Sequence, residues 1–262
     1  MSTLAATHVF DRVVCGVDRS DAGAAAARAA ALVTDPEGSL TLVSANESSI
    51  AVHAGWNMSQ VMEELTTEAD AALEQGSKAA GALHEFEGKL IEGDPLLALL
   101  AEIERRAATA VVVGQHGHTR ATGIALGSVA TQLLHEAPCS VLIARGEIDP
   151  RYWPRRIIVG IDGSEHSARA HEAARTLASR FGAELRAVAA TRDHVDLEAA
   201  RRIAPELREH DSHALDLLSV YSGTTDLMVV GSRGLRGIRA LGSLSERLAH
   251  ETRSSVLVVR DS

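Results

Sequence analysis

Two similar stretches decide the fold of this chain: Arg12-Val-Val-Cys-Gly-Val-Asp-Arg-Ser20 and Arg156-Ile-Ile-Val-Gly-Ile-Asp-Gly-Ser164. Each is a short apolar run that ends in Gly-x-Asp-x-Ser, and each is followed by an Ala-rich stretch. Such a run is typical of a strand buried on both faces, and alanine favours the helix that would follow it. A repeat of this length is too long for a solenoid unit and indicates a duplicated domain.

The repeat extends to the end of each copy. Two further segments of the first copy return in the second, Ala110–Gly117 as Leu227–Gly234 and Cys139–Arg145 as Ser254–Arg260. Between the copies, the polar stretch 146–155 contains two prolines and predicts a linker. We therefore predict two domains, at residues 1–150 and 151–262.

Within the first copy, apolar runs of strand length alternate with longer segments of helical propensity. We predict strands at Arg12–Val17, Leu40–Ser44, Lys89–Ile91, Ala110–Val113 and Ser140–Ala144, and helices at Asp21–Val33, Ser59–His84, Pro95–Ala107 and Ser128–His135. This alternation implies right-handed crossovers and a parallel sheet covered by helices on both faces. The predicted fold class is α/β, with two tandem doubly wound, Rossmann-like domains, each built on a five-stranded parallel sheet of order 3-2-1-4-5.

The second copy is shorter in one region. Asp18 and Gly114 lie 96 positions apart, whereas Asp162 and Gly231 lie 69 positions apart. The missing residues fall between the second and fourth predicted strands, where the long helix of the first copy has only a short counterpart around Asp196–Leu207. We expect the second domain to be a shortened version of the first.

Composition excludes several classes of protein. The chain is 45% hydrophobic and 23% charged, as soluble globular proteins are, and no apolar run approaches the ~20 residues of a membrane helix. Residues 1–150 carry 9 basic and 20 acidic side chains, residues 151–262 carry 17 and 15, and aromatics are 3%, so we expect no nucleic-acid partner. Cys15 and Cys139 are far apart, which disfavours a disulfide framework and predicts buried thiols in a cytoplasmic protein.

A candidate ligand site lies where the strand order reverses, because open parallel sheets bind ligands beyond the carboxyl ends of their strands at that point. Asp18 follows the first predicted strand and Gly114 follows the fourth. Gly114 and Gly117 allow a tight turn and a close approach to a ligand, and Gly127-Ser128 opens a helix whose N–H groups favour a phosphate. Asp18 is a candidate both for contact with the ligand and for capping the helix that begins at Asp21, and the two roles are compatible.

The full pattern G-x2-G-x9-G-S is neither a dinucleotide fingerprint nor a Walker loop. Together with the strand-terminal Asp18, the segment Gly93-Asp-Pro95 and the closing Ala137-Pro-Cys-Ser-Val-Leu-Ile143, it resembles the universal stress protein domain. The resemblance covers residues 8–145 and 155–260, so the whole chain is similar to a tandem universal stress protein.

The resemblance implies an adenine nucleotide site in domain 1. Asp18 would contact the nucleoside beside Gly16, and Ala45 would line the adenine. The matches to the phosphate- and ribose-binding motif are Gly114, Gly117, Gly127 and Ser128, followed by Val129.

The counterparts in domain 2 are Asp162, Ala190, Gly231, Gly234, Gly242 and Ser243. Only seven residues separate Gly234 from Gly242, and this shorter loop puts the second site in doubt.

The resemblance further implies a non-enzymatic stress-response sensor or regulator that binds ATP or AMP, with Mg²⁺ arriving alongside the nucleotide. We expect no catalytic residues, because no general base is evident and the glycine motif has no lysine, and we expect no metal site of the protein's own. The alternative is a nucleotide-free protein-interaction module with inherited glycine loops. An ATP-using transferase would need a further catalytic segment.

The resemblance also implies how the protein assembles, because domains of this family pair through their last strand. The segments Val141–Ala144 and Val256–Val259 would then pair within one chain and cover two sheet edges. The expected partners are therefore an adenine nucleotide, a second half that completes an intramolecular pseudo-dimer or a second chain in a homodimer, and a regulatory protein of unknown identity.

Overall fold

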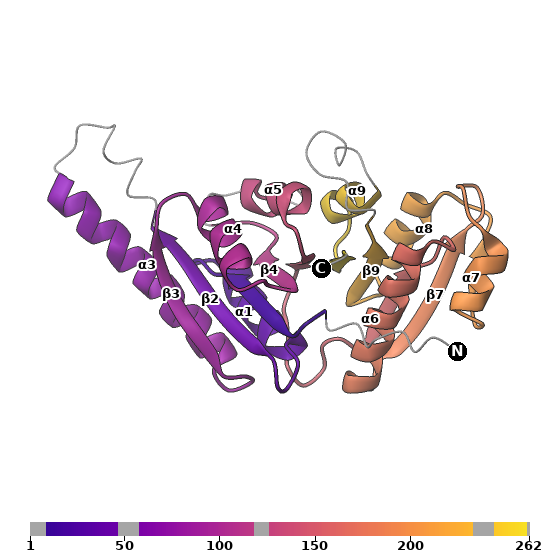
Figure 1. The fold of residues 1–262 in the computed structure, drawn as a ribbon, viewed down its shortest axis with the longest axis horizontal. Coiled ribbons are helices and arrows are strands. Elements are labelled where there is room, and N and C mark those ends of the chain that lie inside the picture. Colours follow the sequence, from indigo (N-terminus) through magenta and orange to yellow (C-terminus); the bar gives the residue numbers. More distant parts are fainter. Residues whose placement is uncertain (1–8, 47–57, 118–125, 233–243, 261–262) are drawn as a thin grey trace.

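The computed structural model describes residues 9–46, 58–117, 126–232 and 244–260, and within these residues it contains one continuous ten-stranded sheet (Figure 1). The elements of the first copy are β1 (Arg12–Gly16), α1 (Asp21–Val33), β2 (Ser39–Asn46), α3 (Met58–Ala80), β3 (Phe86–Glu92), α4 (Pro95–Arg105), β4 (Ala110–Gly114), α5 (Ser128–Glu136) and β5 (Ser140–Ala144). Those of the second are β6 (Arg156–Gly160), α6 (Glu165–Phe181), β7 (Glu184–Ala190), α7 (Leu197–Ile203), β8 (Arg208–His210), α8 (Ala214–Tyr221), β9 (Leu227–Gly231), α9 (Leu244–Glu251) and β10 (Ser255–Val259).

The strand order of the sheet is β3-β2-β1-β4-β5-β10-β9-β6-β7-β8. Each half therefore has the order 3-2-1-4-5, and all strand pairs within a half are parallel. The predicted α/β class and the predicted doubly wound topology are both confirmed. The carboxyl ends of β1 and β4, which are neighbours, form the switch point of the first half.

The two halves join through β5 and β10, which pair antiparallel at the centre of the sheet. Val141 lies opposite Val258, and Ile143 lies opposite Val256. The expected pairing of the two last strands is thus present. Both strands are buried along their whole length, so the pairing removes two edges that would otherwise expose unpaired backbone groups.

Helices cover both faces of the sheet in the same way in each half (Figure 1). On one face α1, α3, α6 and α7 pack against the strands, and on the other face lie α4, α5, α8 and α9. Helix α1 is Ala-rich, and nine of its thirteen residues are buried. Alanine side chains let this helix approach β1 and β4 closely, which places its first turn at the switch point.

Polar caps fix where the helices at the switch points begin. Ser20 caps α1, with its hydroxyl accepting from Gly23 N at 3.0 Å, and Ser164 caps α6 in the same way through Ser167 N. Asp94 caps α4, whose first residue is Pro95, as the sequence indicates. The two copies therefore begin the helix after their first strand with the same serine cap.

The structure corrects several predicted boundaries. Strand β3 was predicted at Lys89–Ile91 and is observed at Phe86–Glu92. This strand lies at the edge of the sheet and mixes polar with apolar residues, so a search for continuous apolar runs does not find its full length. The long helix predicted at Ser59–His84 ends at Ala80, and the counterpart predicted around Asp196–Leu207 is the short α7.

Both cysteine thiols are free and buried, as predicted. Burial, helped by the Asp18 carboxylate, raises the pKa of the Cys15 thiol, and burial raises the pKa of Cys139 to about 12. Both thiols are therefore protonated and unreactive at neutral pH. In the described part of the chain, no helix has the length and apolar character needed to cross a membrane, and no three His, Cys, Asp or Glu side chains are grouped to hold a metal ion.

Candidate functional site

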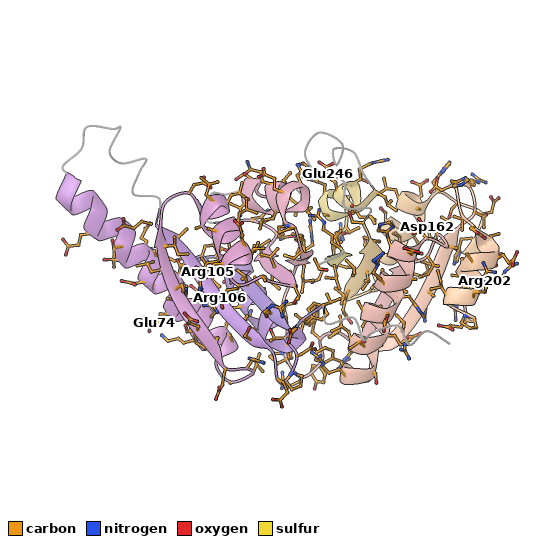
Figure 2. All side chains as sticks on the ribbon, in the orientation of Figure 1. Glu74, Arg105, Arg106, Asp162, Arg202 and Glu246 are labelled. Carbon is orange, nitrogen blue, oxygen red and sulfur yellow. The ribbon has the colours of Figure 1, made fainter. Side chains whose placement is uncertain are left out.

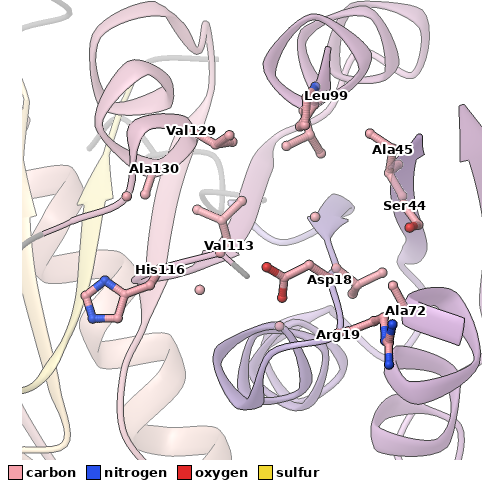
Figure 3. Close-up of a pocket in the computed structure, with 18 of the residues that line it drawn as sticks. Asp18, Arg19, Ser44, Ala45, Ala72, Leu99, Val113, His116, Val129 and Ala130 are labelled. Atoms are coloured by element: carbon pink, nitrogen blue, oxygen red, sulfur yellow. The ribbon is translucent and has the colours of Figure 1, made fainter. Parts of the chain in front are cut away.

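A pocket of about 310 Å³ opens at the carboxyl ends of β1, β2 and β4 in the first half (Figure 3). It is bounded by the first turn of α1, by α3 and α4, and by the start of α5. All eight site residues predicted for domain 1 line it: Gly16, Asp18, Ala45, Gly114, Gly117, Gly127, Ser128 and Val129. Residues up to 113 positions apart in the chain thus meet in one cavity, whose volume lies at the lower end of the about 300–1,000 Å³ of small-molecule sites.

Asp18 lies at the centre of the pocket (Figure 3). Its Oδ1 accepts hydrogen bonds from Ser20 N, at 3.0 Å, and from the Ser20 hydroxyl. Its Oδ2 faces the glycine loop, since a Cβ on Gly117 would lie 3.1 Å from it. Asp18 does not cap α1, because Ser20 does, and so the predicted capping role is wrong. One carboxylate oxygen holds the turn and the other lies beside the loop.

The glycines of the motif serve two different purposes. A Cβ on Gly114 would lie 2.7 Å from the carbonyl of Ala22, and a Cβ on Gly23 would lie 2.4 Å from Asp18 Oδ1. Gly114, from the motif, is therefore required by the close approach of α1 to β4, and Gly23, in the first turn of α1, is required by the close approach of that helix to Asp18. We expected Gly114 to make room for a ligand, but the space left by its missing side chain is filled by α1. Gly117 and Gly127 lack such backbone collisions and lie on the pocket surface.

The start of α5 is held open toward the pocket. Its N-cap residue, Gly127, has no side chain that could cap the helix. Ser128 and Val129 in the first turn line the cavity. The amide of Gly127 donates to the carbonyl of Gln115 at 2.7 Å, which closes the loop back onto the end of β4. The first N–H groups of this nine-residue helix and its positive dipole end favour an anion at this position.

The opposite wall of the pocket was missed by the sequence analysis. It consists of Ala69 and Ala72 from α3 and of Pro95 and Leu99 from α4, which line the pocket together with Ala45 on β2; Ala45, Ala72 and Leu99 are labelled in Figure 3. Together these residues give this part of the pocket an apolar lining. The three-residue spacing of the two alanines places them on one helix face, but nothing in the sequence shows which strand that face meets.

An ion pair crosses the rim of the pocket between α1's loop and α3. Arg19 Nη1 lies 3.2 Å from Glu68 Oε1, and both side chains are about half exposed. Both residues also line the pocket. Such an exposed pair contributes little to stability, but it places one cation and one anion beside the apolar part of the pocket.

The second half repeats the turn at the end of its first strand. Asp162 Oδ1 accepts from Ser164 N at 3.0 Å and from its hydroxyl at 2.6 Å, and a Cβ on Gly231 would lie 2.4 Å from the carbonyl of His166 on α6. Ala190 ends β7 and pairs with β8. The other predicted residues, Gly234, Gly242 and Ser243, lie outside the described residues, as does the segment between them.

The segment that replaces α3 closes onto the switch point of the second half. Asp196 N donates to the carbonyl of Asp162 at 3.0 Å. Just before it, Asp193 accepts from Ala214 N at the start of α8, at 2.6 Å, and pairs with His213 Nδ1 at 2.8 Å. These bonds hold the loop after β7 against the end of β6 and the start of α8. In the first half, the counterparts of these two elements, β1 and α4, border the pocket.

The fold and the pocket define a class of protein: a doubly wound α/β chain of two similar halves, with a small-molecule pocket at the switch point of the first. Comparison with known sequences identifies the family. The sequence model of the universal stress protein family matches residues 10–145, 154–221 and 220–260, and the chain therefore belongs to this family.

Relatives of similar length support this assignment. Universal stress protein Rv1996 of Mycobacterium tuberculosis is 30% identical over 237 residues, which cover 75% of this chain and 74% of the relative. A universal stress protein of Mycolicibacterium smegmatis is 30% identical over 240 residues, covering 79% and 82%. Among solved structures, a universal stress protein from Archaeoglobus fulgidus superposes with a TM-score of 0.73 at 20% identity, over 96% of both chains. That similarity supports the tandem fold.

Proposed function

We propose that the pocket of the first half binds an adenine nucleotide, ATP or AMP, and that the protein is a non-enzymatic sensor or regulator in the stress response. The observation that carries the proposal is that all eight residues predicted from the motif and the family resemblance line one cavity. Each region of that cavity has the chemistry that one part of a nucleotide requires.

The apolar part of the pocket suits a base. It is lined by Ala45, Ala72 and Leu99, and burial of a base against them would supply affinity without a charged partner. Asp18 Oδ2, which faces the glycine loop, would accept hydrogen bonds from ribose hydroxyl groups. Phosphates would then lie at the start of α5, near Ser128, and Mg²⁺ would come with them.

A regulatory role follows from the way in which the charged groups of the pocket are used. Asp18 holds the Ser20 turn, and Glu68 pairs with Arg19, so neither is placed as a free general base. A ligand that binds only the folded protein stabilises it, by ~2.7 kcal/mol at a hundred times its dissociation constant. Nucleotide binding could thereby shift an equilibrium between forms of the protein that a partner distinguishes.

We also propose that one chain acts as an intramolecular pseudo-dimer. The antiparallel pairing of β5 with β10 supports this proposal, since it brings the two halves together through equivalent strands. The alternative of a nucleotide-free interaction module would keep this pairing, and it is separated from our proposal by the binding experiment below.

The experiment is calorimetric titration of nucleotide-stripped protein with ATP and Mg²⁺. We expect about one site per chain, and an affinity at least about tenfold weaker in Asp18→Asn, because the charge that favours the ribose bonds is lost. Asp162→Asn is the matched control: it changes the same turn in the second half and should leave the affinity of the first site unaltered.

Absence of binding up to millimolar ATP in the wild-type protein would reject the nucleotide proposal and favour the interaction module. Two sites per chain, with one lost in Asp162→Asn, would show that the second half also binds nucleotide.

A further inference from the structure

Two equivalent arginines join the halves of the molecule. Arg145 follows β5 and Arg260 follows β10, and both are buried, with 5% and 7% of their surface exposed. Their backbone amides donate to opposite serine hydroxyls, Arg145 N to Ser255 Oγ and Arg260 N to Ser140 Oγ, both at 3.1 Å. The backbone contacts of the two arginines are therefore symmetric.

Each guanidinium reaches the last helix of the other half. Arg145 donates to the carbonyl of Ala249 in α9, and Arg260 donates to the carbonyl of Leu134 in α5. These carbonyls belong to the last turns of their helices, where a cation is favoured by the helix dipole. The two helices lie side by side above the β5–β10 pair (Figure 1), and Glu246 on α9 (Figure 2) lies 3.1 Å from the imidazole of His135 on α5.

Both guanidinium groups make further contacts. Arg260 donates to a second carbonyl at the end of α5, that of Ala137, and Arg145 Nη1 donates to Gln115 Oε1 at 2.9 Å. Gln115 follows Gly114, and the matching position after Gly231 is Ser232, whose side chain has three fewer non-hydrogen atoms. Arg145 thus bonds to the loop of the first half as well as to α9.

Gln115 is a central residue of that loop. It lines the pocket. Its backbone N–H donates to the carbonyl of Ala144 at 3.2 Å, and its backbone carbonyl accepts a hydrogen bond from the backbone N–H of Gly127 at 2.7 Å. The side-chain bond from Arg145 adds a third attachment, from a residue that is itself anchored on α9. The start of α5 is thus linked, through Gln115 and Arg145, to α9 of the second half.

We propose that Arg145 is a positioning residue through which α9 of the second half holds the ligand-binding loop of the first half. The proposal rests on the proposed nucleotide site for its effect on affinity, but not for its effect on the loop. It gives the second half a specific role, which is to fix the shape of the site in the first half.

The test compares three variants. Gln115→Ser copies the residue of the second half and removes the loop bond, Arg145→Met removes the loop bond together with the bond to Ala249, and Arg260→Met is the symmetric control that removes the bonds to Leu134 and Ala137. Two quantities are measured for each: the exchange rate of the Gly127 amide in nucleotide-free protein, and the dissociation constant for ATP with Mg²⁺.

We expect Gly127 to exchange about tenfold faster in Gln115→Ser and in Arg145→Met, because its acceptor is no longer held. Arg260→Met should leave that rate within about twofold of wild type. ATP affinity should weaken roughly fivefold in the first two variants, as expected when one charge-assisted bond that orders the site is lost. The double variant Gln115→Ser/Arg145→Met should bind ATP no more weakly than Arg145→Met, because both changes remove the same bond between Arg145 and Gln115.

Unchanged Gly127 exchange in Gln115→Ser would overturn the proposal, and so would equal acceleration in Arg260→Met, which would show a general loosening. If the wild-type protein binds no ATP, the proposed function fails while the exchange measurement still decides the role of Arg145. Should Arg145→Met not fold, Gln115→Ser gives the same decision, since it leaves the anchor on α9 in place.

Discussion

The two halves of the molecule share their strand order, their Asp-x-Ser turn and the close approach of the next helix, yet they differ at the switch point. In the first half, α3 runs for 23 residues and provides one wall of the pocket. In the second, α7 has seven residues, and the loop before it bonds to Asp162 and to the start of α8. The comparison teaches that the Asp turn and the strand-ending glycine recur as parts of the fold, whereas the segment between the second and fourth strands, which supplies one wall of the pocket in the first half, differs between the halves.

The largest effect expected from this comparison concerns the strand-ending glycines. Gly114→Ala and Gly231→Ala would each force a Cβ against the backbone of the adjacent helix, and we expect each to lower the free energy of unfolding by about 3 kcal/mol. Urea unfolding followed by circular dichroism measures this loss. Equal losses in the two halves would show that this glycine serves packing in both.

Gly160→Ala is the control for these variants, because a Cβ there would be at 3.6 Å from its nearest neighbours, an ordinary contact. It should change stability by less than about 1 kcal/mol. If Gly114→Ala keeps wild-type stability and loses only ATP binding, the glycine belongs to the ligand site and our packing explanation is wrong.

A second difference between the halves is a buried carboxylate. Glu102 on α4 accepts from Arg105 at 2.6 Å and from Arg106 at 3.1 Å, with Lys89 Nζ at 3.4 Å, whereas the position twelve residues before Gly231 is Ser219. The hydrogen bond from Arg105, with those of the other cations, lowers the pKa of Glu102 to about 2.

Because the pKa in the folded state lies below the ordinary value, this cluster stabilises the protein at neutral pH, and its contribution is lost as pH falls from about 4.5 toward 2. We expect Glu102→Gln to cost roughly 2–3 kcal/mol at pH 7 and progressively less below pH 4.5. Urea unfolding of both proteins between pH 7 and pH 3 measures this difference. A difference that does not change with pH would mean that packing, rather than charge, accounts for the loss.

Most of the fold could be predicted because buried parallel strands are short apolar runs. β5 and α1 were predicted to the residue, and the order 3-2-1-4-5 followed from the alternation together with the family resemblance. β3 was predicted too short, since an edge strand exposes alternate side chains and has no continuous apolar run.

The site was predictable where the motif is local and not where it depends on tertiary packing. The Asp turn and the Gly-Ser helix start are local patterns, and both line the pocket. The wall formed by Ala69 and Leu99 depends on how two helices pack over β2, which spacing alone does not show. The separate duties of Gly114 and Gly117 also appear only when the position of α1 is known.

The smallest expected effect tests the loop that closes the second half. Asp193 bonds to His213 and to the amide of Ala214, and these bonds lower the pKa of its carboxyl. Its contribution to stability is therefore present above the ordinary pKa of an aspartate, near 4, and is lost as pH falls below it. Since the side chain is partly exposed, Asp193→Ala should cost less than about 1 kcal/mol.

The more informative measurement for Asp193→Ala is hydrogen exchange of the first turn of α8, which should accelerate at pH 7 as its N-terminal partner is lost. Lowering the pH of the wild-type protein below about 4 should produce the same relative change. Asp216→Ala, a change to another acidic residue in the first turn of α8, is the control and should not reproduce it. If α8 exchanges at the wild-type rate without Asp193, the loop does not hold this helix, and some other feature must distinguish the switch point of the second half from that of the first.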